Sequence, residues 1–207
     1  MTILPEEKRL AWAITGSGHY LRESLAILKT LENVDIFLSK AAAEIIKQYG
    51  FQAQLDATNH KVYQDKTASS VPVELLYAGT YHTLVIAPAT SNTVAKMAYG
   101  FSDSLVTNLY AQAGKTRVPS IIFACDTVPV SGEYTIDSVA PRDNVVQVYP
   151  RQIDLDNVQK LSCFENTQIV ESIDMLQHAV SMRLAAIGAI GATAPHPNPL
   201  PQAGEGA

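Results

Sequence analysis

Four short apolar runs alternate with helical patterns along the first 126 residues. The apolar runs cover 10–15, 34–38, 83–86 and 119–124, and amphipathic segments follow over 21–31, 41–48, 94–98 and 106–113. An apolar run of this kind, bounded by turn residues, is typical of a strand buried on both faces of a parallel sheet. The pattern therefore predicts a succession of strand–helix units.

The remaining segments are less regular. Residues 51–80 are polar and predict a long connection, either a lid or an oligomer contact, in which 71–76 forms a short strand or begins a helix. Residues 129–150 are rich in turn formers, with a short strand expected at 145–148, and helices are expected over 154–164 and 167–190. The second of these carries an apolar stripe at helical spacing: Ile169, Ile173, Leu176, Val180 and Leu184.

These elements predict one domain over residues 1–190 with an α/β fold. We expect a three-layer Rossmann-like (flavodoxin-like) doubly wound parallel sheet with helices on both faces. The length of 207 residues and the hydrophobic content of 47% are sufficient for one good core. Residues 191–207 are rich in proline and glycine, and we expect this tail to be disordered.

The charge balance and the cysteine content exclude several classes of protein. The formal net charge is -5 without a Lys/Arg cluster, which argues against binding to nucleic acid or to an anionic membrane. Cys125 and Cys163 have no metal-ligand spacing and form no disulfide framework, so we expect no metal site and a reducing compartment. Cys125 is expected to be a buried, unreactive thiol. No apolar signal segment opens the chain, and the longest apolar candidate, 176–190, is interrupted by His178 and Arg183. We therefore expect a cytoplasmic protein.

A glycine-rich turn, Gly-Ser-Gly at 16–18, joins the first strand to the first helix. Glycines let the backbone approach a ligand, and the N–H groups of a helix start favour a phosphate. A dinucleotide site would need a third glycine where this chain has Leu21 and an acidic residue where it has Ser39 and Lys40, so NAD is disfavoured. Ser17 and Ser39 suit a phosphate monoester, and Lys40 is either a further cation for it or an exposed lysine.

A second polar segment follows the third apolar run. Pro88 lacks an N–H and suits the point where that strand leaves the sheet, and Ser91 or Asn92 can cap the next helix. In the loop before the helix at 106–113, Ser102 and Asp103 are typical of a helix N-cap. Because the carboxyl ends of parallel strands share one edge, all of these segments are expected to line the same ligand pocket.

Together these segments resemble the homo-oligomeric flavin-containing cysteine decarboxylase superfamily, over about residues 9–126, most specifically in Pro-Ala-Thr-Ser-Asn at 88–92. The resemblance implies that the domain binds FMN, with the phosphate near Ser17 and Ser39, the isoalloxazine ring against 90–92 and backbone contacts from 102–105. It also implies a trimer-based homo-oligomer with the flavin at a subunit interface. The cofactor-binding residues that it implies are Gly16, Ser17, Gly18, Ser39, Lys40, Pro88, Ala89, Thr90, Ser91, Asn92, Thr93, Ser102, Asp103, Ser104 and Leu105.

Two departures from the decarboxylase pattern narrow the implied reaction. Decarboxylase members carry a His-apolar-x-Leu element, where this chain has Pro-Val-Glu-Leu at 72–75, and a Pro-x-Met-Asn-x-x-Met segment, where it has Cys-Asp-Thr-Val-Pro at 125–129. The chain is more similar to the archaeoflavoprotein and dihydromethanopterin reductase (acceptor) branch. That branch implies an FMN-dependent oxidoreductase that transfers a hydride to dihydromethanopterin, or a related dihydropterin, and gives the tetrahydro form.

The proton donor, the electron donor and other functions stay open. His19 and Asp126 are the catalytic candidates, with Tyr20 or solvent as other proton sources, whereas His60, His82 and His178 are expected to be structural or exposed. The electron donor is ferredoxin or an NAD(P)H-linked reductase. The alternatives are an FMN electron-transfer protein that accepts electrons from ferredoxin, a decarboxylase or flavin prenyltransferase of the same superfamily, and a non-enzymatic sensor of a phosphate ligand.

Overall fold

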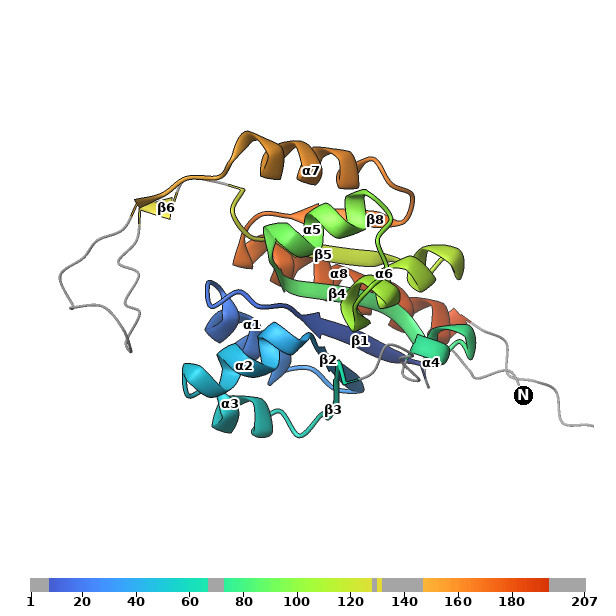
Figure 1. Ribbon diagram of the computed structural model, residues 1–207. Coiled ribbons are helices and arrows are strands. Elements are labelled where there is room, and N and C mark those ends of the chain that lie inside the picture. Colours follow the sequence, from blue (N-terminus) through green and yellow to red (C-terminus); the bar gives the residue numbers. More distant parts are fainter. Residues whose placement is uncertain (1–7, 67–72, 128–129, 132–146, 194–207) are drawn as a thin grey trace, which may run out of the picture.

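The computed structural model describes residues 8–66, 73–127, 130–131 and 147–193. A sheet of six parallel strands in the order β3-β2-β1-β4-β5-β8 forms its centre (Figure 1). The strands are β1 (Arg9–Ile14), β2 (Val34–Leu38), β3 (Lys61–Gln64), β4 (Tyr81–Ala89), β5 (Ser120–Ala124) and β8 (Thr167–Val170). The chain proceeds outward from β1 to β3 and then returns to β4 on the other side of β1. The strand order therefore reverses between β1 and β4, which is where doubly wound folds bind their ligands.

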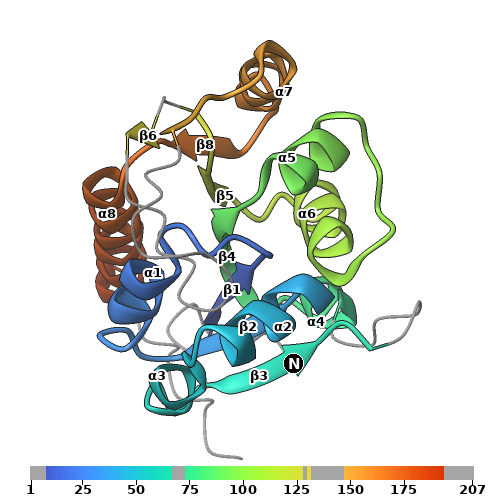
Figure 2. The same cartoon turned by 60° about the vertical axis from the view of Figure 1, so that its left-hand side comes forward.

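Helices cover both faces of the sheet, so the predicted three-layer fold is confirmed (Figure 2). One face packs against α1 (Leu21–Leu28), α2 (Lys40–Gln48), α3 (Gln52–Asp56) and α8 (Ile173–Thr193). The other packs against α4 (Glu74–Tyr77), α5 (Ser91–Ala98), α6 (Leu105–Lys115) and α7 (Gln152–Ser162).

Strand β1 shows why two cores form. Leu10, Trp12 and Ile14 belong to the core on the α1 and α8 side, whereas Ala11 and Ala13 belong to the core on the α5 and α6 side. Successive side chains of a strand point to opposite faces, so a continuous apolar run serves both layers. This burial on both faces is the reason that the central strands are evident from the sequence.

The predicted helix over 167–190 is wrong in its first part. Residues 167–170 form the edge strand β8, and α8 begins only at Ile173 and continues through Thr193. Ile169 packs with the core on the α6 side, whereas Leu176 and Val180 are buried in the core on the α1 side, with Ile173 and Leu184 packed against it. The helix thus extends three residues into the segment 191–207 that was expected to be a disordered tail, and 194–207 lie outside the described residues.

The polar segment 51–80 is more ordered than a connection. It contains α3, the edge strand β3 and the short helix α4. For 71–76 the sequence allowed either a short strand or the start of a helix, and α4 shows that a helix begins there. Residues 71–72 lie outside the described residues. A small antiparallel pair, β6 (Val130–Ser131) and β7 (Gln147–Val148), confirms the second half of the predicted 145–148 strand. Within the described ranges, no helix has the length and apolarity needed to cross a membrane.

Candidate functional site

Thr15 joins the carboxyl ends of β1 and β4. Its hydroxyl donates to the carbonyl oxygen of Pro88 at 2.8 Å and accepts the N–H of Thr90 at 2.8 Å, and its own N–H also donates to Pro88 at 3.1 Å. Only 2% of Thr15 is exposed. These buried bonds hold the loops that leave β1 and β4 together at the point where the strand order reverses.

The helices that begin at this edge differ in how their first N–H groups are satisfied. Ser39, Thr90 and Ser104 cap α2, α5 and α6, each through a side-chain oxygen that accepts a backbone N–H. Tyr20 precedes α1, but its side chain makes no capping bond and its φ of 63° lies in the left-handed region. The start of α1 therefore offers first-turn N–H groups to an external acceptor, and its positive dipole end favours an anion.

The loop before α1 packs directly against the start of α2. A Cβ on Gly16 would lie 2.5 Å from the Cβ of Ala41, so this close approach requires glycine. The N–H of Ser39 donates to the carbonyl oxygen of Ile14 at 3.1 Å, which places Ser39 beside the end of β1. The Ser39 oxygen accepts the N–H of Ala42 at 3.1 Å, and its hydroxyl keeps a proton to donate.

Ser17 lies inside the same loop. Its hydroxyl donates to the carbonyl oxygen of His19 at 3.2 Å, and it also hydrogen-bonds with the thiol of Cys125 at the end of β5. Gly18 and Lys40 are both exposed, at the loop tip and at the first position of α2. The fold thus brings the predicted phosphate-binding residues of the first and second strands to one corner.

Thr90, rather than Ser91 or Asn92, caps α5. Its oxygen accepts the N–H of Thr93 at 3.3 Å, and the two threonine hydroxyls lie 3.0 Å apart. The expected cap is displaced by one residue because the chain leaves the extended conformation at Thr90. Ser91 instead donates to Asp126 Oδ2 at 2.6 Å, and Asn92 is exposed.

Pro88 and Ala89 contribute to the corner through their backbone. Both residues are buried at the end of β4, so Pro88 belongs to the strand rather than marking its exit from the sheet. The carbonyl of Ala89 accepts the N–H of Cys125 at 2.9 Å, which ties the loop after β5 to the same edge.

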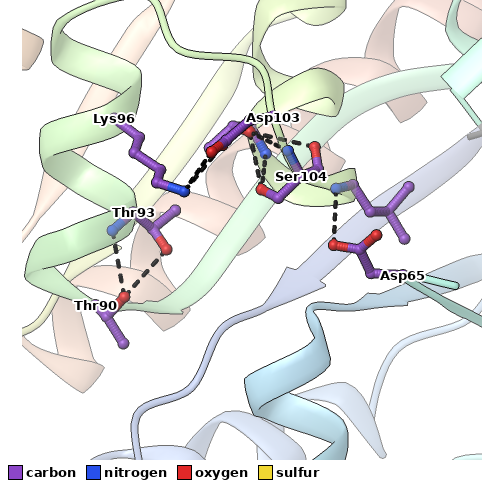
Figure 3. Close-up of polar contacts among 8 residues, drawn as sticks. Asp65, Thr90, Thr93, Lys96, Asp103 and Ser104 are labelled. Carbon is purple, nitrogen blue, oxygen red and sulfur yellow. Dashed lines mark hydrogen bonds and ion pairs between the residues drawn. The ribbon is translucent and has the colours of Figure 1, made fainter. Parts of the chain in front are cut away.

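The loop between α5 and α6 is fastened by polar contacts (Figure 3). Lys96 Nζ lies 2.7 Å from Asp103 Oδ2, and this bond lowers the pKa of Asp103. Ser104, not Ser102 or Asp103, caps α6, in a capping box with Thr107. The predicted cap pair therefore lies in the loop, where Asp103 serves as an ion-pair partner.

Leu105 and Ser102, two predicted FMN-binding residues of this loop, are engaged away from the loop that contains Ser17. The N–H of Leu105 donates to Asp65 Oδ2 at 3.1 Å, so the predicted backbone donor at Leu105 is already bonded to the residue that follows β3 (Figure 3). Ser102 lines a separate cavity of about 290 Å³ together with Tyr110 and Phe164. A ligand contact from Leu105 would require Asp65 to release that N–H.

Four titratable groups follow the carboxyl ends of β1 and β5: His19, Tyr20, Cys125 and Asp126. His19 is half-buried and its ring stacks on that of Tyr20 at 3.6 Å; burial lowers the pKa of His19, and the charge of Asp126 opposes that shift. Burial also raises the pKa of Tyr20, and it raises the pKa of Cys125 to about 12. Cys125 is therefore a protonated, buried thiol at neutral pH, as the sequence predicts.

Several residues of the site were not predicted as functional. Thr15, Asp65 and Lys96 hold the loops, but each has its partner on another element, so spacing along the chain gives no signal for it. Three histidines expected to be structural or exposed are so: His60 hydrogen-bonds with the carbonyl oxygen of Leu28, His82 hydrogen-bonds with the hydroxyl of Thr83, and His178 is exposed. In the part of the chain that the structure describes, no group of three or more His, Cys, Asp or Glu side chains could hold a metal ion.

Comparison with known proteins identifies the family. The model of the Flavoprotein family matches residues 4–192. The chain belongs to the Flavoprotein family. The superfamily inferred from the four loop segments is thereby confirmed, and the match extends well past the 9–126 region that carried the resemblance.

Three proteins of known sequence or structure are similar to this flavoprotein. The crystal structure of Burkholderia xenovorans DmrB in complex with FMN, a cubic protein cage for redox transfer, is 48% identical, has a TM-score of 0.81, and covers 88% of this chain and 98% of that one. Uncharacterized protein MJ0730 of Methanocaldococcus jannaschii is 34% identical over 178 residues, 83% of this chain and 94% of the relative. The dihydromethanopterin reductase (acceptor) of Methanosarcina mazei is 38% identical over 147 residues, 65% of this chain and 59% of that reductase. The chain thus spans less than two thirds of that reductase.

Proposed function

We propose that this flavoprotein is an FMN-dependent oxidoreductase that reduces dihydromethanopterin, or a related dihydropterin, to the tetrahydro form. The observation that carries the proposal is the corner at the carboxyl ends of β1 and β2, where the loop before the uncapped helix α1, which contains Ser17, packs against the start of α2 at Ser39. The 48% identity to an FMN-containing redox protein over almost its full length supports FMN as the ligand. The reductase name of a shorter match supports the pterin as the acceptor.

The residues of the crevice fit FMN in two parts. First-turn N–H groups of α1 and the hydroxyl of Ser39 would hold the phosphate, because each supplies a donor to an anion, and Ser17 would join them once its hydroxyl releases the carbonyl oxygen of His19. Thr90 and Ser91 present short polar groups beside the end of β4, where the ring of the flavin would lie. Bound FMN in its reduced state supplies the hydride that the dihydropterin accepts.

The proton that accompanies the hydride needs a donor near the same edge. His19 is half-buried and neutral at neutral pH, because burial lowers its pKa, and the charge of Asp126 lies close enough to oppose this shift. Asp126 in turn accepts the hydroxyl of Ser91 at 2.6 Å, which fixes its carboxylate. We assign His19 the role of taking up a proton from solvent and passing it to the pterin, and Asp126 the role of stabilising the imidazolium that exists between these two transfers.

The proposal includes assembly into a trimer-based homo-oligomer with the flavin at a subunit interface. Tyr77, Tyr99 and Phe101 are 57% to 61% exposed, on the side of the sheet that carries α4, α5 and α6. Large exposed aromatic side chains on one side of a domain are typical of a protein interface. The 48% identical relative forms a cubic protein cage, which supports assembly into a homo-oligomer. Light scattering of wild-type protein and of Phe101→Glu tests it, since the variant is expected to dissociate.

The reaction is tested under anaerobic conditions with the flavin chemically reduced before mixing. Addition of dihydromethanopterin is expected to restore the absorbance of oxidised flavin, with one tetrahydro product formed for each flavin. Ferricyanide, which takes electrons without a proton, serves as the control acceptor. Flavin that stays reduced with the pterin but is oxidised by ferricyanide would refute the reductase and favour the electron-transfer alternative, with ferredoxin as donor.

Variants of two histidines separate the proton step from folding. His19→Gln is expected to slow oxidation by the pterin by about a hundredfold, which is the lower end of the range for general acid catalysis, and to leave oxidation by ferricyanide unchanged. His178→Gln, on the exposed side of α8, is the matched control and should change neither rate. Equal slowing of both acceptors would contradict the role of His19.

A further inference from the structure

A second cavity, of about 260 Å³, lies at the amino edge of the sheet, opposite the flavin crevice. Four parts of the chain converge on it: Lys8 before β1, Tyr81 and His82 at the start of β4, residues 116–119 between α6 and β5, and Arg183 with Ile187 on α8. The proposed redox reaction uses none of these residues.

The cavity is strongly positive. Lys8, Arg117 and Arg183 line it, and none of its nine lining residues is acidic. The buried carboxylate at this edge, Asp35, already accepts from Arg9 at 2.8 Å and from the hydroxyl of Tyr81 at 2.7 Å. In a chain with a net charge of -5, three cations around one cavity without a lining carboxylate form a local field that attracts anions.

Arg183 is held in a fixed orientation. Its Nε donates to the hydroxyl of Thr83 at 3.0 Å, and its Nη2 donates to the carbonyl oxygen of His82 at 3.2 Å. These contacts use two of the five N–H groups of the guanidinium, so a fixed planar fork is available beside the cavity. A guanidinium fixed in this way is suited to bind phosphate through two parallel hydrogen bonds.

Arg117 occupies a backbone position that normally favours glycine. Its φ is 56°, and it follows the end of α6 in a Schellman arrangement, in which Arg117 N–H donates to Gly114 and Val118 N–H donates to Ala113. Of the six non-glycine residues with positive φ that the structure describes, four are Asn or Asp; the others are Tyr20, at the flavin crevice, and Arg117. Strained residues of this kind cluster at binding sites.

The pKa of His82 is affected by the same cations. Burial lowers the pKa of His82 to about 4, and the charges of Arg183 and Lys8 contribute to the lowering. The imidazole is therefore neutral at neutral pH and is surrounded by cations whose charge is not balanced within the cavity.

We propose that this cavity binds a small phosphate-bearing anion with at least two negative charges, such as inorganic pyrophosphate or the diphosphate of a nucleotide. Its volume is below the range of about 300 Å³ and more that is typical of pockets for larger ligands, so the cavity itself holds the phosphates only. Arg183 and Pro119 also line an adjoining cavity of about 520 Å³, which gives room for a nucleoside.

The test is calorimetric titration of FMN-loaded protein with pyrophosphate at constant ionic strength, because loading with FMN removes the flavin phosphate site from the measurement. Wild-type protein is expected to bind pyrophosphate. Arg117→Gly removes one cation while it relieves the positive φ, so it is expected to weaken binding by about tenfold or more, the loss of one charge-assisted hydrogen bond, with thermal stability maintained. Lys8→Gln is expected to weaken binding in the same direction.

Lys115→Gln is the matched control, because Lys115 is an exposed cation of the last turn of α6 that does not line the cavity. It should bind pyrophosphate as the wild type does. Titration with ADP identifies the source of the phosphate. If ADP binds with the same affinity as pyrophosphate, the ligand is the inorganic anion, and if ADP binds more tightly than pyrophosphate, the ligand is a nucleotide. No binding by the FMN-loaded wild type, or equal binding by Arg117→Gly and wild type, would overturn the proposal.

Discussion

The Thr15 hydroxyl offers the sharpest test of how the crevice is built. Thr15→Val keeps the shape of the side chain but removes the bond to the carbonyl of Pro88 and the acceptor for the N–H of Thr90, both at 2.8 Å. One lost hydrogen bond costs about 1 kcal/mol, and a partly buried N–H left without an acceptor costs about 1–2 kcal/mol more. Pro88 keeps its bond from the Thr15 N–H, so no further penalty arises there.

We therefore expect Thr15→Val to lower the free energy of unfolding by about 2–3 kcal/mol in urea denaturation. Thr15→Ser, which keeps the hydroxyl and loses one buried methyl, is the control and should lose only about 1 kcal/mol. Because Thr90 begins the helix beside the proposed ring site, Thr15→Val should also weaken FMN binding, whereas Thr15→Ser should not. If both variants are equally stable, the hydroxyl does not hold the two loops together and this explanation of the crevice is wrong.

Three further predictions follow from single contacts. Gly16→Ala should destabilise the protein by about 1–3 kcal/mol, since its Cβ would lie 2.5 Å from that of Ala41, and Ala41→Gly in the same chain should restore much of the loss in urea denaturation. Stability should fall by about 2 kcal/mol between pH 7 and pH 5 from His82 alone, because its folded pKa of about 4 lies below the ordinary value, so the unfolded chain binds the proton first; His82→Gln should flatten that slope. Cys125, with its pKa raised to about 12 by burial, should react with iodoacetamide only after unfolding, which mass spectrometry can follow; rapid labelling of the folded protein would contradict the burial.

The centre of the fold could be predicted because its strands are buried on both faces. Residues 34–38 are apolar at four of five positions and form β2 with the predicted limits. The edge strands β3 and β8 could not be recognised in this way, because only one residue of these two short strands is fully buried. Ile169 and Val170 also continue the apolar spacing of α8, so the sequence alone favours one long helix.

The candidate site was predicted by segment but not by atomic role. Strand ends converge on one edge in any parallel sheet, so the sequence could place these segments together at that edge, and their contact with a ligand stays a prediction. Which hydroxyl caps a helix depends on where the chain leaves the extended conformation, and in runs of Ser, Thr and Asn several residues compete for that role. Thr90 and Ser104 therefore differ from the predicted caps by one or two residues each. Thr15 bonds to Thr90, 75 positions away, and no local pattern encodes that contact.

We infer that the start of α1, with Ser17 and Ser39, binds the phosphate of FMN. Parallel fluorescence titrations of the apoprotein with FMN and with riboflavin, which lacks the phosphate, test it most directly. FMN should bind about a hundredfold more tightly or better, the equivalent of about one to two charge-assisted hydrogen bonds, and Ser17→Ala with Ser39→Ala should remove much of that preference. Equal affinities for FMN and riboflavin in the wild type would rule out a phosphate site at the start of α1.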